Sequence, residues 1–246
     1  MRRLFIPGRL AATVTLSGSD AHHLGYTLRA HVGERCVVVD AERQVASMEI
    51  TGFTADTVTL RLVERLEADT EPPIRLTLAV CLLKADKMDF VVQKAVELGA
   101  AKVQPIESEN CVARYDGKKS EARRERWQRI AGEAAKQCGR TALLTVAPIL
   151  PFDEWIRARQ DEDGPAFFCY EAEKEKSLGV WLAETQSDAF TALIGPEGGF
   201  TPGEAEQAKA AGLAAVTLGP RILRAETAAI AATTIVQYVK GDLGRE

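Results

Sequence analysis

The sequence predicts an α/β protein in which a small β-rich domain precedes a larger domain with a mostly parallel sheet. Two observations lead to this prediction. Short β-branched runs between Gly and Asp turns dominate the chain as far as Glu71-Pro72-Pro73, and strand and helix patterns alternate after that point. We therefore expect one domain at 1–72 and a second at 73–246, and 246 residues are enough to bury a sizeable core.

The first domain is expected to contain four strands and one helix. The strands are expected at 12–16, 35–40, 44–51 and 57–62, where apolar residues alternate or cluster. The helix is expected at 20–30, with Ser19 as its N-cap. A small β-barrel with one helix fits this order of elements.

The second domain is expected to alternate six strands with six helices. Apolar residues recur at helical spacing from Met88 to Leu98, and Gly99 stands where that helix should end. Thr201-Pro202-Gly203-Glu204 predicts a capping box, so a helix should begin directly after the turn at 198–200. The expected strands are 75–83, 102–106, 143–148, 166–170, 190–194 and 214–218, and the expected helices are 87–98, 121–138, 152–158, 177–185, 202–211 and 226–240.

Composition excludes several classes of protein. With 46% hydrophobic and 27% charged residues, the chain has ordinary globular usage, and its longest apolar runs of about eight residues are far shorter than a membrane-spanning helix. Pro7-Gly8 interrupts the N-terminal apolar run before it resembles an export signal. Five widely spaced cysteines without a C-x-x-C pair argue against disulfides and zinc. We expect a soluble cytoplasmic protein with no membrane segment and no metal.

Charge is unevenly distributed along the chain. A net charge of −4 counts against nucleic-acid binding, but the segment 113–140 has nine basic residues and four acidic ones. The simplest interpretation is a solvated helix face, and the alternative is a surface that contacts a phosphate backbone. The candidate RNA-binding residues are Arg123, Arg124, Arg126 and Arg129 on the helix and Arg2, Arg3, Arg9 and Arg29 in the first domain.

Two glycine-containing loops follow predicted strands. The segment 194–200 lies at the carboxyl end of a strand, where α/β sheets bind ligands, although it matches neither a P-loop nor a dinucleotide motif. A tight turn that needs positive φ is the alternative. In the segment 218–228, Ile222 and Leu223 stand between two arginines, as would suit a flat ligand such as adenine. Alternatively, this apolar pair packs the loop onto the core and Arg224 pairs with Glu226.

In combination, these two loops resemble those of a known family. Ile194-Gly-Pro-Glu-Gly-Gly-Phe200 and Leu218-Gly-Pro-Arg-Ile-Leu-Arg-Ala-Glu-Thr-Ala228 closely resemble motifs of the RsmE family of 16S ribosomal RNA uridine N3-methyltransferases, which belong to the SPOUT class. The resemblance covers nearly the whole chain. It departs at Glu109-Asn110-Cys111, where many relatives have Glu-Arg-Ser, and at Cys138, where Ser is common. We therefore do not assign the 109–111 loop as an RNA site.

The resemblance implies a PUA-like β-barrel followed by a trefoil-knotted domain that holds S-adenosylmethionine. It also implies a homodimer whose substrate is 16S rRNA, either free or within the assembled small subunit. The cofactor-binding residues that it implies are Leu193, Ile194, Gly195, Pro196, Glu197, Gly198, Gly199, Leu218, Gly219, Ile222 and Leu223.

The implied reaction needs a way to deprotonate uracil N3, which is mostly protonated at neutral pH. All three histidines lie in the first 31 residues, which leaves Glu226 as the candidate base and Arg221 and Arg224 as cations for the uracil anion. Glu226 could instead be a helix-start carboxylate paired with an arginine. Two other classes stay open: a nucleotide-dependent enzyme that uses the Gly-rich loop, and a non-catalytic RNA-binding protein.

Overall fold

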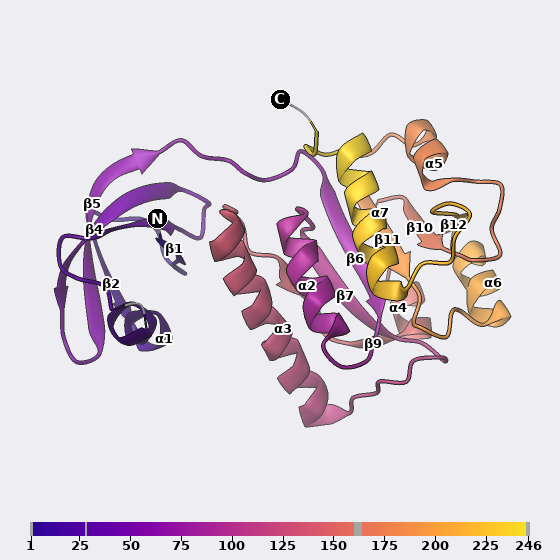
Figure 1. Ribbon diagram of the computed structural model, residues 1–246, viewed down its shortest axis with the longest axis horizontal. Coiled ribbons are helices and arrows are strands. Elements are labelled where there is room, and N and C mark those ends of the chain that lie inside the picture. Colours follow the sequence, from indigo (N-terminus) through magenta and orange to yellow (C-terminus); the bar gives the residue numbers. More distant parts are fainter. Residues whose placement is uncertain (1, 28, 160–163, 245–246) are drawn as a thin grey trace. The chain divides into compact units, whose positions relative to one another are not determined.

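The structure is a computed structural model that describes residues 2–27, 29–159 and 164–244, and it forms two compact units. The first unit comprises Met1–Glu71 with Ala135–Ala142, and the second comprises Pro72–Ala134 with Leu143–Glu246 (Figure 1). The segment 135–142 thus packs with the first unit, although it follows the second unit's strands in sequence. The division into folding domains at residue 72 stays a prediction.

A curled, mixed sheet forms the first unit. Its strand order is β1-β3-β4-β5-β2, with β1 parallel to β3 and the other pairs antiparallel. No pairing joins β1 to β2 within the described part of the chain, so these pairings do not show a closed barrel. The strands are β1 (Arg2–Phe5), β2 (Thr13–Ser17), β3 (Arg35–Val39), β4 (Val45–Phe53) and β5 (Thr57–Leu66). β1 was not expected, because it has only four residues and begins with two arginines.

The expected helix at 20–30 is wrong in length and in type. The structure has a short α1 (Gly18–His22) that continues as a π-helix, η1 (His23–Thr27). Leu24 of η1 is fully buried in the core of the unit beside residues of β4 and β5, such as Met48 and Leu60. Burial of this side chain, rather than helix periodicity, holds the segment in place. The side chain of Ser19, the expected N-cap, lies outside the described residues.

The second unit contains the expected α/β fold with a parallel sheet. Its strand order is β12-β10-β11-β6-β7-β8, with β9 also paired to β7, and every pair is parallel. The strands are β6 (Arg75–Cys81), β7 (Lys102–Glu107), β8 (Thr145–Val146), β9 (Leu150–Pro151), β10 (Ala166–Cys169), β11 (Ala189–Ile194) and β12 (Ala214–Val216). The strand expected at 143–148 is therefore reduced to two residues, and β9 was not expected.

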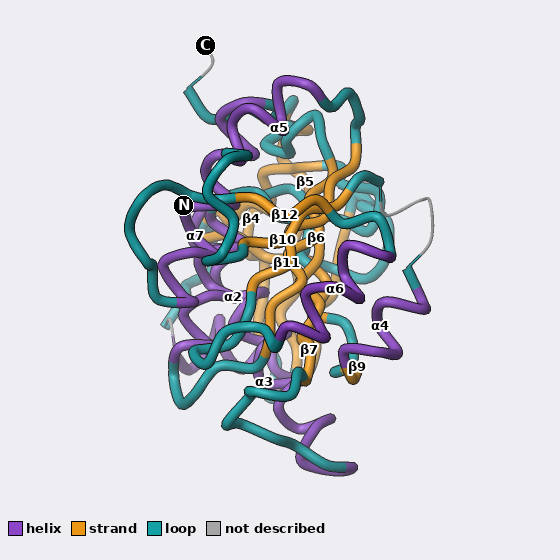
Figure 2. Tube along the Cα trace, turned by 90° about the vertical axis from the view of Figure 1, so that its right-hand side faces the viewer, coloured by secondary structure: helices purple, strands orange, loops and turns teal. Residues whose placement is uncertain are grey.

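Helices lie on both faces of this sheet. Figure 2 shows α2, α3 and α7 on one side and α4 and α6 on the other, which is a three-layer arrangement. The helices are α2 (Lys87–Glu97), α3 (Gly117–Cys138), α4 (Phe152–Ala158), α5 (Leu178–Glu184), α6 (Pro202–Ala210) and α7 (Ala225–Val239). Among the described residues, no helix has the length and apolar character needed to cross a membrane.

Local sequence signals determine where two of these helices begin or end. The Thr201 hydroxyl accepts a hydrogen bond from the Glu204 backbone N–H, and the Glu204 carboxylate accepts one from the Thr201 N–H, which confirms the capping box. Gly99 has φ +80°, which confirms that a left-handed residue follows α2. All six residues of β11 are buried, as expected for a strand inside a parallel sheet. The loop that leaves β11 therefore starts from a buried strand inside the sheet.

Candidate functional site

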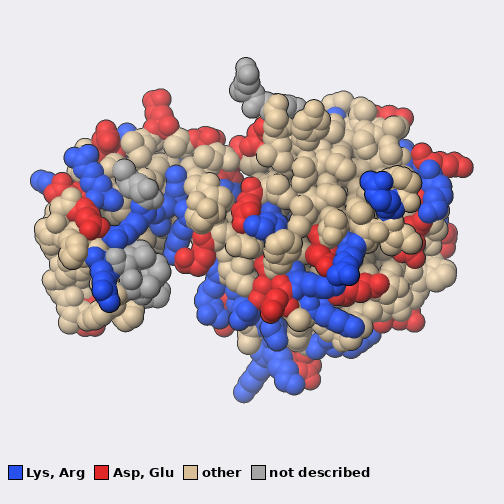
Figure 3. All heavy atoms as spheres, in the orientation of Figure 1, with Lys and Arg blue, Asp and Glu red and all other residues tan. Residues whose placement is uncertain are grey.

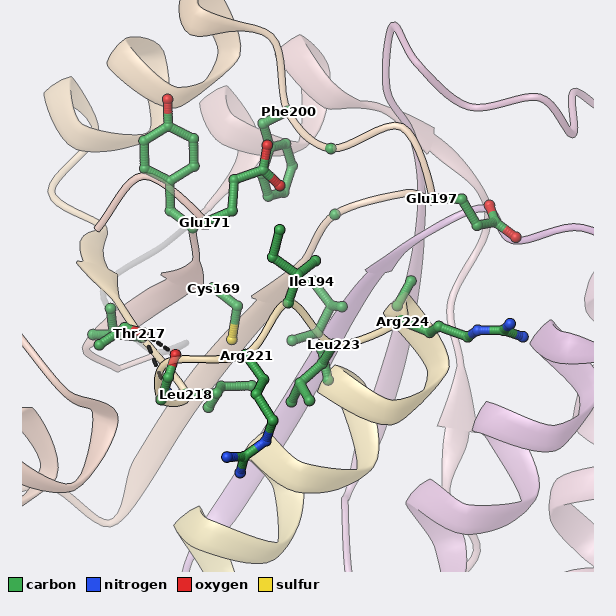
Figure 4. A pocket seen from close by; sticks show the side chains of 18 of the residues that line it. Cys169, Glu171, Ile194, Glu197, Phe200, Thr217, Leu218, Arg221, Leu223 and Arg224 are labelled. Atoms are coloured by element: carbon green, nitrogen blue, oxygen red, sulfur yellow. Dashed lines mark hydrogen bonds between the residues drawn. The ribbon is translucent and has the colours of Figure 1, made fainter. Parts of the chain in front are cut away.

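A pocket opens at the carboxyl ends of β10, β11 and β12, which are neighbours in the parallel sheet (Figure 4). Its volume is about 420 Å³, within the roughly 300–1000 Å³ typical of small-molecule sites. The segments 169–171, 194–200 and 216–225 supply most of its walls. This is the edge at which open α/β sheets bind ligands.

The centre of the pocket is apolar. Figure 4 shows Ile194, Leu218 and Leu223 lying close together there. Ile194 is buried, whereas Leu218 and Leu223 are partly exposed toward the cavity. Such a surface suits a flat, largely apolar ring. Ile222 also lines the pocket, but 85% of its surface is exposed.

Glycines make the bends of the two loops possible. A Cβ on Gly195 would lie 3.0 Å from the Phe200 ring, which packs over it. Gly199 and Gly219 have φ of +70° and +121°, conformations that L side chains rarely adopt. The turn at Gly219 is further fixed by Thr217, whose hydroxyl accepts a hydrogen bond from the Gly219 N–H and donates one to its carbonyl, both at 3.1 Å. The alternative interpretation of a turn needing positive φ thus holds for these residues, and the turn borders a cavity.

A carboxylate lies at one end of the pocket. Glu171 follows β10, lines the cavity and lies near Phe200 (Figure 4). Its carboxylate oxygens lie 3.2 and 3.3 Å from the position that a Cβ on Gly199 would take. The pocket can therefore present a negative charge to a cationic group of a ligand.

At a second side of the pocket, Lys87 connects two carboxylates. Its Nζ donates to Glu197 Oε1 at 3.1 Å and lies 3.2 Å from Glu226 Oε2. These three residues come from the start of α2, the loop after β11 and the start of α7. The hydrogen bond with Glu197 is the main cause that raises the pKa of Lys87. Burial would raise the pKa of Glu197, but the hydrogen bonds from Lys87 and from backbone N–H groups lower it.

Glu226 pairs with the same lysine. Its Oε2 is buried and lies 3.2 Å from the Lys87 ammonium, and this contact also contributes to raising the pKa of Lys87. Figure 4 shows Arg224 and Glu197 directed to one side of the pocket and Arg221 directed elsewhere. Arg221 and Arg224 line the cavity, whereas Glu226 follows the lining residue Ala225 and does not itself line it.

The loop that departs from the RsmE pattern supports the Gly-rich turn. The Asn110 amide donates to the carbonyl oxygens of Gly198 and Gly199 at 3.3 and 3.0 Å. A Cβ on Gly198 would lie 3.0 Å from the Asn110 Cβ, so these loops are closely packed. Cys111 is buried, and its Sγ accepts a hydrogen bond from the Ser108 N–H at 3.4 Å. Asn110, at a position where many relatives have Arg, therefore holds the Gly-rich turn by hydrogen bonds.

The structure brings together most of the residues expected to bind the cofactor. Leu193 is fully buried within β11 and does not line the pocket, and Gly198 faces Asn110 instead. The expected residues that line the pocket are Ile194, Gly195, Pro196, Glu197, Gly199, Leu218, Gly219, Ile222 and Leu223. Their role in binding stays a prediction.

The four arginines of α3 differ in their partners. Figure 3 shows Lys and Arg side chains gathered over the N-terminal half of this helix. Arg124 pairs with Glu121, and Arg126 pairs with Asp89 of α2. The described residues include no ion-pair partner for Arg123, which lies over the Tyr115 ring, or for the exposed Arg129.

The arginines expected to bind RNA in the first unit are also partly engaged. Arg2 pairs with Glu34, Arg9 pairs with Glu42, and Arg3 donates to the Arg140 carbonyl at 2.9 Å. Arg29 is exposed and has φ +46°, in the left-handed region. These arginines do not form one free basic surface.

Sequence reasoning missed three residues of the pocket region. Lys87 lies at the start of α2, and no role was assigned to it from the sequence. Glu171 follows the buried strand β10, and the rule that ligands lie at carboxyl ends of parallel strands could have identified it. Asn110 could not be found, because its contact with the Gly-rich turn spans 88 residues of sequence. Within the described residues, His, Cys, Asp and Glu form no group of three or more that could hold a metal ion.

Comparison with known proteins gives consistent matches. Residues 70–237 match the model of the RNA methyltransferase domain family. Ribosomal RNA small subunit methyltransferase E of Bacillus subtilis is 31% identical, over 93% of this chain and 91% of that protein. The Synechocystis protein of the same name is 34% identical, over 89% of this chain and 71% of that protein. The crystal structure of ribosomal RNA small subunit methyltransferase E from Neisseria gonorrhoeae, bound to S-adenosyl methionine, superposes with a TM-score of 0.89 at 34% identity, covering 98% of this chain and 99% of that one.

Proposed function

The chain belongs to the RNA methyltransferase family, and we propose that it uses S-adenosylmethionine to methylate N3 of a specific uridine in 16S ribosomal RNA. The observation that supports this most strongly is the pocket at the ends of β10, β11 and β12, in a fold shared with a relative bound to that cofactor. The family match favours this function over a nucleoside-triphosphate-dependent enzyme and over a non-catalytic RNA-binding protein.

The residues of the pocket fit S-adenosylmethionine, which is a flat base linked to a chain with cationic groups. Leu218, Leu223 and Ile194 offer an apolar surface for the adenine. We propose that Glu171 attracts a cationic group of the cofactor, since charge-assisted contacts are stronger than neutral ones. When bound, the cofactor supplies an electrophilic methyl group on a sulfonium.

The side of the pocket with Lys87, Glu197 and Arg224 is the proposed site of transfer. It concentrates ionisable groups from three elements, and Arg224 is directed toward it (Figure 4). Arg224 would stabilise the negative charge that develops on the uracil ring, because a fixed cation does so without reorganisation. Arg221 is directed elsewhere, and so it is the weaker candidate.

Glu226 is the proposed proton acceptor. Its carboxylate lies at the start of α7, two residues after Arg224, and its Oε2 is 3.2 Å from the Lys87 ammonium. In the proposed step, N3 forms a bond to the methyl carbon as the bond from that carbon to sulfur breaks. The N3 proton passes to Glu226, directly or through water. Glu197 is less suited to this role, because its carboxylate already accepts hydrogen bonds from Lys87 and from the Lys84 N–H.

We further propose the finer features that the family resemblance implies. These are a trefoil knot in the second unit, a PUA-like first unit that helps to hold RNA, and a homodimer. Support for the knot comes from the sheet order, in which β12 lies on the far side of β10 from β11. The substrate would be 16S rRNA, within or outside the assembled small subunit, and the cytoplasm is where we expect the protein to act.

A Glu226→Gln variant tests the proposed chemistry. Gln keeps the size of the side chain but is no longer a base. The variant should bind the cofactor normally in calorimetry and lose roughly a hundredfold or more in single-turnover methylation. Raising the pH should restore part of the rate, because solvent then deprotonates more of the uracil. A near wild-type rate at every pH would assign Glu226 to structure and leave the arginines as the electrostatic groups.

A further inference from the structure

The first unit has a smaller cavity of its own. Its volume is about 210 Å³, and it lies between the α1–η1 segment and the turn that joins β4 to β5. His22, Gly25 and Tyr26 line it on one side, and Phe53, Asp56 and Thr57 line it on the other. It is too small for a ligand of cofactor size.

Aromatic rings at this cavity are unusually accessible. The His22 and Tyr26 rings stack with centroids 4.7 Å apart and an angle of 21° between their planes. Tyr26 is 66% exposed and Phe53 is 38% exposed. Unpaired nucleic-acid bases bind to proteins by stacking on such rings.

The backbone leaves the cavity open and holds its walls in place. A Cβ at Gly25 would lie 3.7 Å from the Phe53 ring, so a larger side chain there would occupy the space beside it. In the facing turn, the Thr54 hydroxyl accepts hydrogen bonds from the Asp56 and Thr57 N–H groups at 3.3 and 3.0 Å. The other wall is a π-helical turn, a conformation that is rare and is often found at functional sites.

The charges at the cavity favour one class of base. Asp56 is exposed and has no hydrogen-bond donor on its carboxylate among the described residues, and an ionised carboxylate can only accept. It therefore matches the exocyclic amino group of adenine, cytosine or guanine, whereas uracil has no such group.

We propose that this cavity binds an unpaired base with an amino group, in the RNA strand that carries the target uridine. The proposal rests on the proposed function, and it adds a second point of contact that is distinct from the site of methyl transfer. The base stacks on Tyr26 beside Phe53, and its amino group donates to Asp56. Because uracil lacks this donor, the cavity binds another base of the strand and not the target itself.

Binding of labelled single-stranded oligoadenylate, oligouridylate and an abasic oligonucleotide, measured by fluorescence anisotropy, tests the proposal. Tyr26→Ala removes the ring, and Gly25→Val fills the cavity while keeping every aromatic residue. Each should weaken oligoadenylate binding about tenfold, as loss of one base stack does, and leave binding of the abasic strand unchanged. Val32→Ala is the matched control, because Val32 is a 61%-exposed apolar residue of the same unit that does not line the cavity.

Base preference gives an independent readout. Asp56→Asn should reduce the preference for oligoadenylate over oligouridylate, because an amide both donates and accepts. Wild-type affinity for oligoadenylate in folded Tyr26→Ala and Gly25→Val variants would overturn the proposal. Methylation of small-subunit RNA by the same variants separates the two ideas. If the variants methylate RNA with an unchanged KM and bind oligonucleotides as the wild type does, only the cavity proposal is contradicted. If the wild-type protein does not methylate RNA but still binds oligonucleotides through the cavity, only the proposed function is contradicted.

Discussion

Replacing Gly199 by alanine is expected to weaken binding of S-adenosylmethionine about ten- to a hundredfold while the protein stays folded. Gly199 has φ +70°, so an alanine there costs roughly 1–2 kcal/mol in backbone strain. The added Cβ would lie 3.2 Å from Glu171 Oε2, closer than a normal contact, and the flexible carboxylate would move away. A hydrogen bond to a charged group contributes roughly 1.5–3 kcal/mol, which corresponds to the expected loss of affinity.

Gly212→Ala provides the matched control. Gly212 follows α6 with φ +82°, and a Cβ there meets nothing within 4 Å. The free energy of unfolding should therefore fall by a similar amount in both variants. Each kcal/mol lost lowers the thermal midpoint by about 2–4 °C in a chain of this size. Only Gly199→Ala should change the dissociation constant in calorimetric titration.

The double variant with Glu171→Ala isolates the cause of the loss. If the alanine at 199 acts by displacing the carboxylate, Glu171→Ala alone should weaken binding to a similar extent, and adding Gly199→Ala should change little more. Additive losses, or unchanged affinity in folded Gly199→Ala, would refute the assignment of Glu171 to the cofactor.

Three further predictions concern the charged groups. Lys87→Met should slow single-turnover methylation, whereas Lys94→Met, which removes a comparably exposed lysine of the same helix, should leave the rate unchanged. Glu197→Gln should lower the thermal midpoint at neutral pH. Because the folded pKa of Glu197 is lowered, its ion pair stabilises the protein above the unfolded value of about 4.3, so this difference should shrink as the pH falls below about 4. Reversing the charges of Arg123 and Arg129 should weaken RNA binding and flatten its salt dependence, and an unchanged slope would identify them as solvated residues.

The sequence predicts the second unit well, because its signals are local. The capping box at Thr201 and Glu204 and the glycine after α2 fix helix ends through contacts within a few residues. Continuous apolar runs such as Ala189–Ile194 indicate strands buried on both faces. These elements place the two loops correctly along the chain, so the pocket forms where the sequence placed the Gly-rich turns.

The first unit was harder to predict for physical reasons. β1 consists of four residues and pairs in parallel with β3, a contact that no alternation in its own sequence encodes. The expected helix at 20–30 contains Gly25, which has poor helix propensity, and the segment turns into a π-helix instead. Leu24, beside this glycine, is fully buried in the core of the unit, and local propensity does not encode that contact.

Contacts between distant segments also limited what could be inferred about the site. Lys87 and Glu226 are 139 positions apart in the sequence, yet they lie 3.2 Å from each other. The basic helix looked uniform in sequence, but Asp89 on another helix pairs with Arg126. Charge counting along one segment cannot detect a partner that another segment supplies, as for Arg126, whereas the partner of Arg124 is Glu121 of the same helix.

Identification of the methylated nucleoside tests the central claim most directly. The protein is incubated with S-adenosylmethionine that carries an isotopically labelled methyl group and with small ribosomal subunits that lack the modification. The 16S rRNA is then digested to nucleosides for mass spectrometry. We expect the label in 3-methyluridine at a single position. Label at uracil C5, on a ribose hydroxyl or in another nucleoside would contradict it.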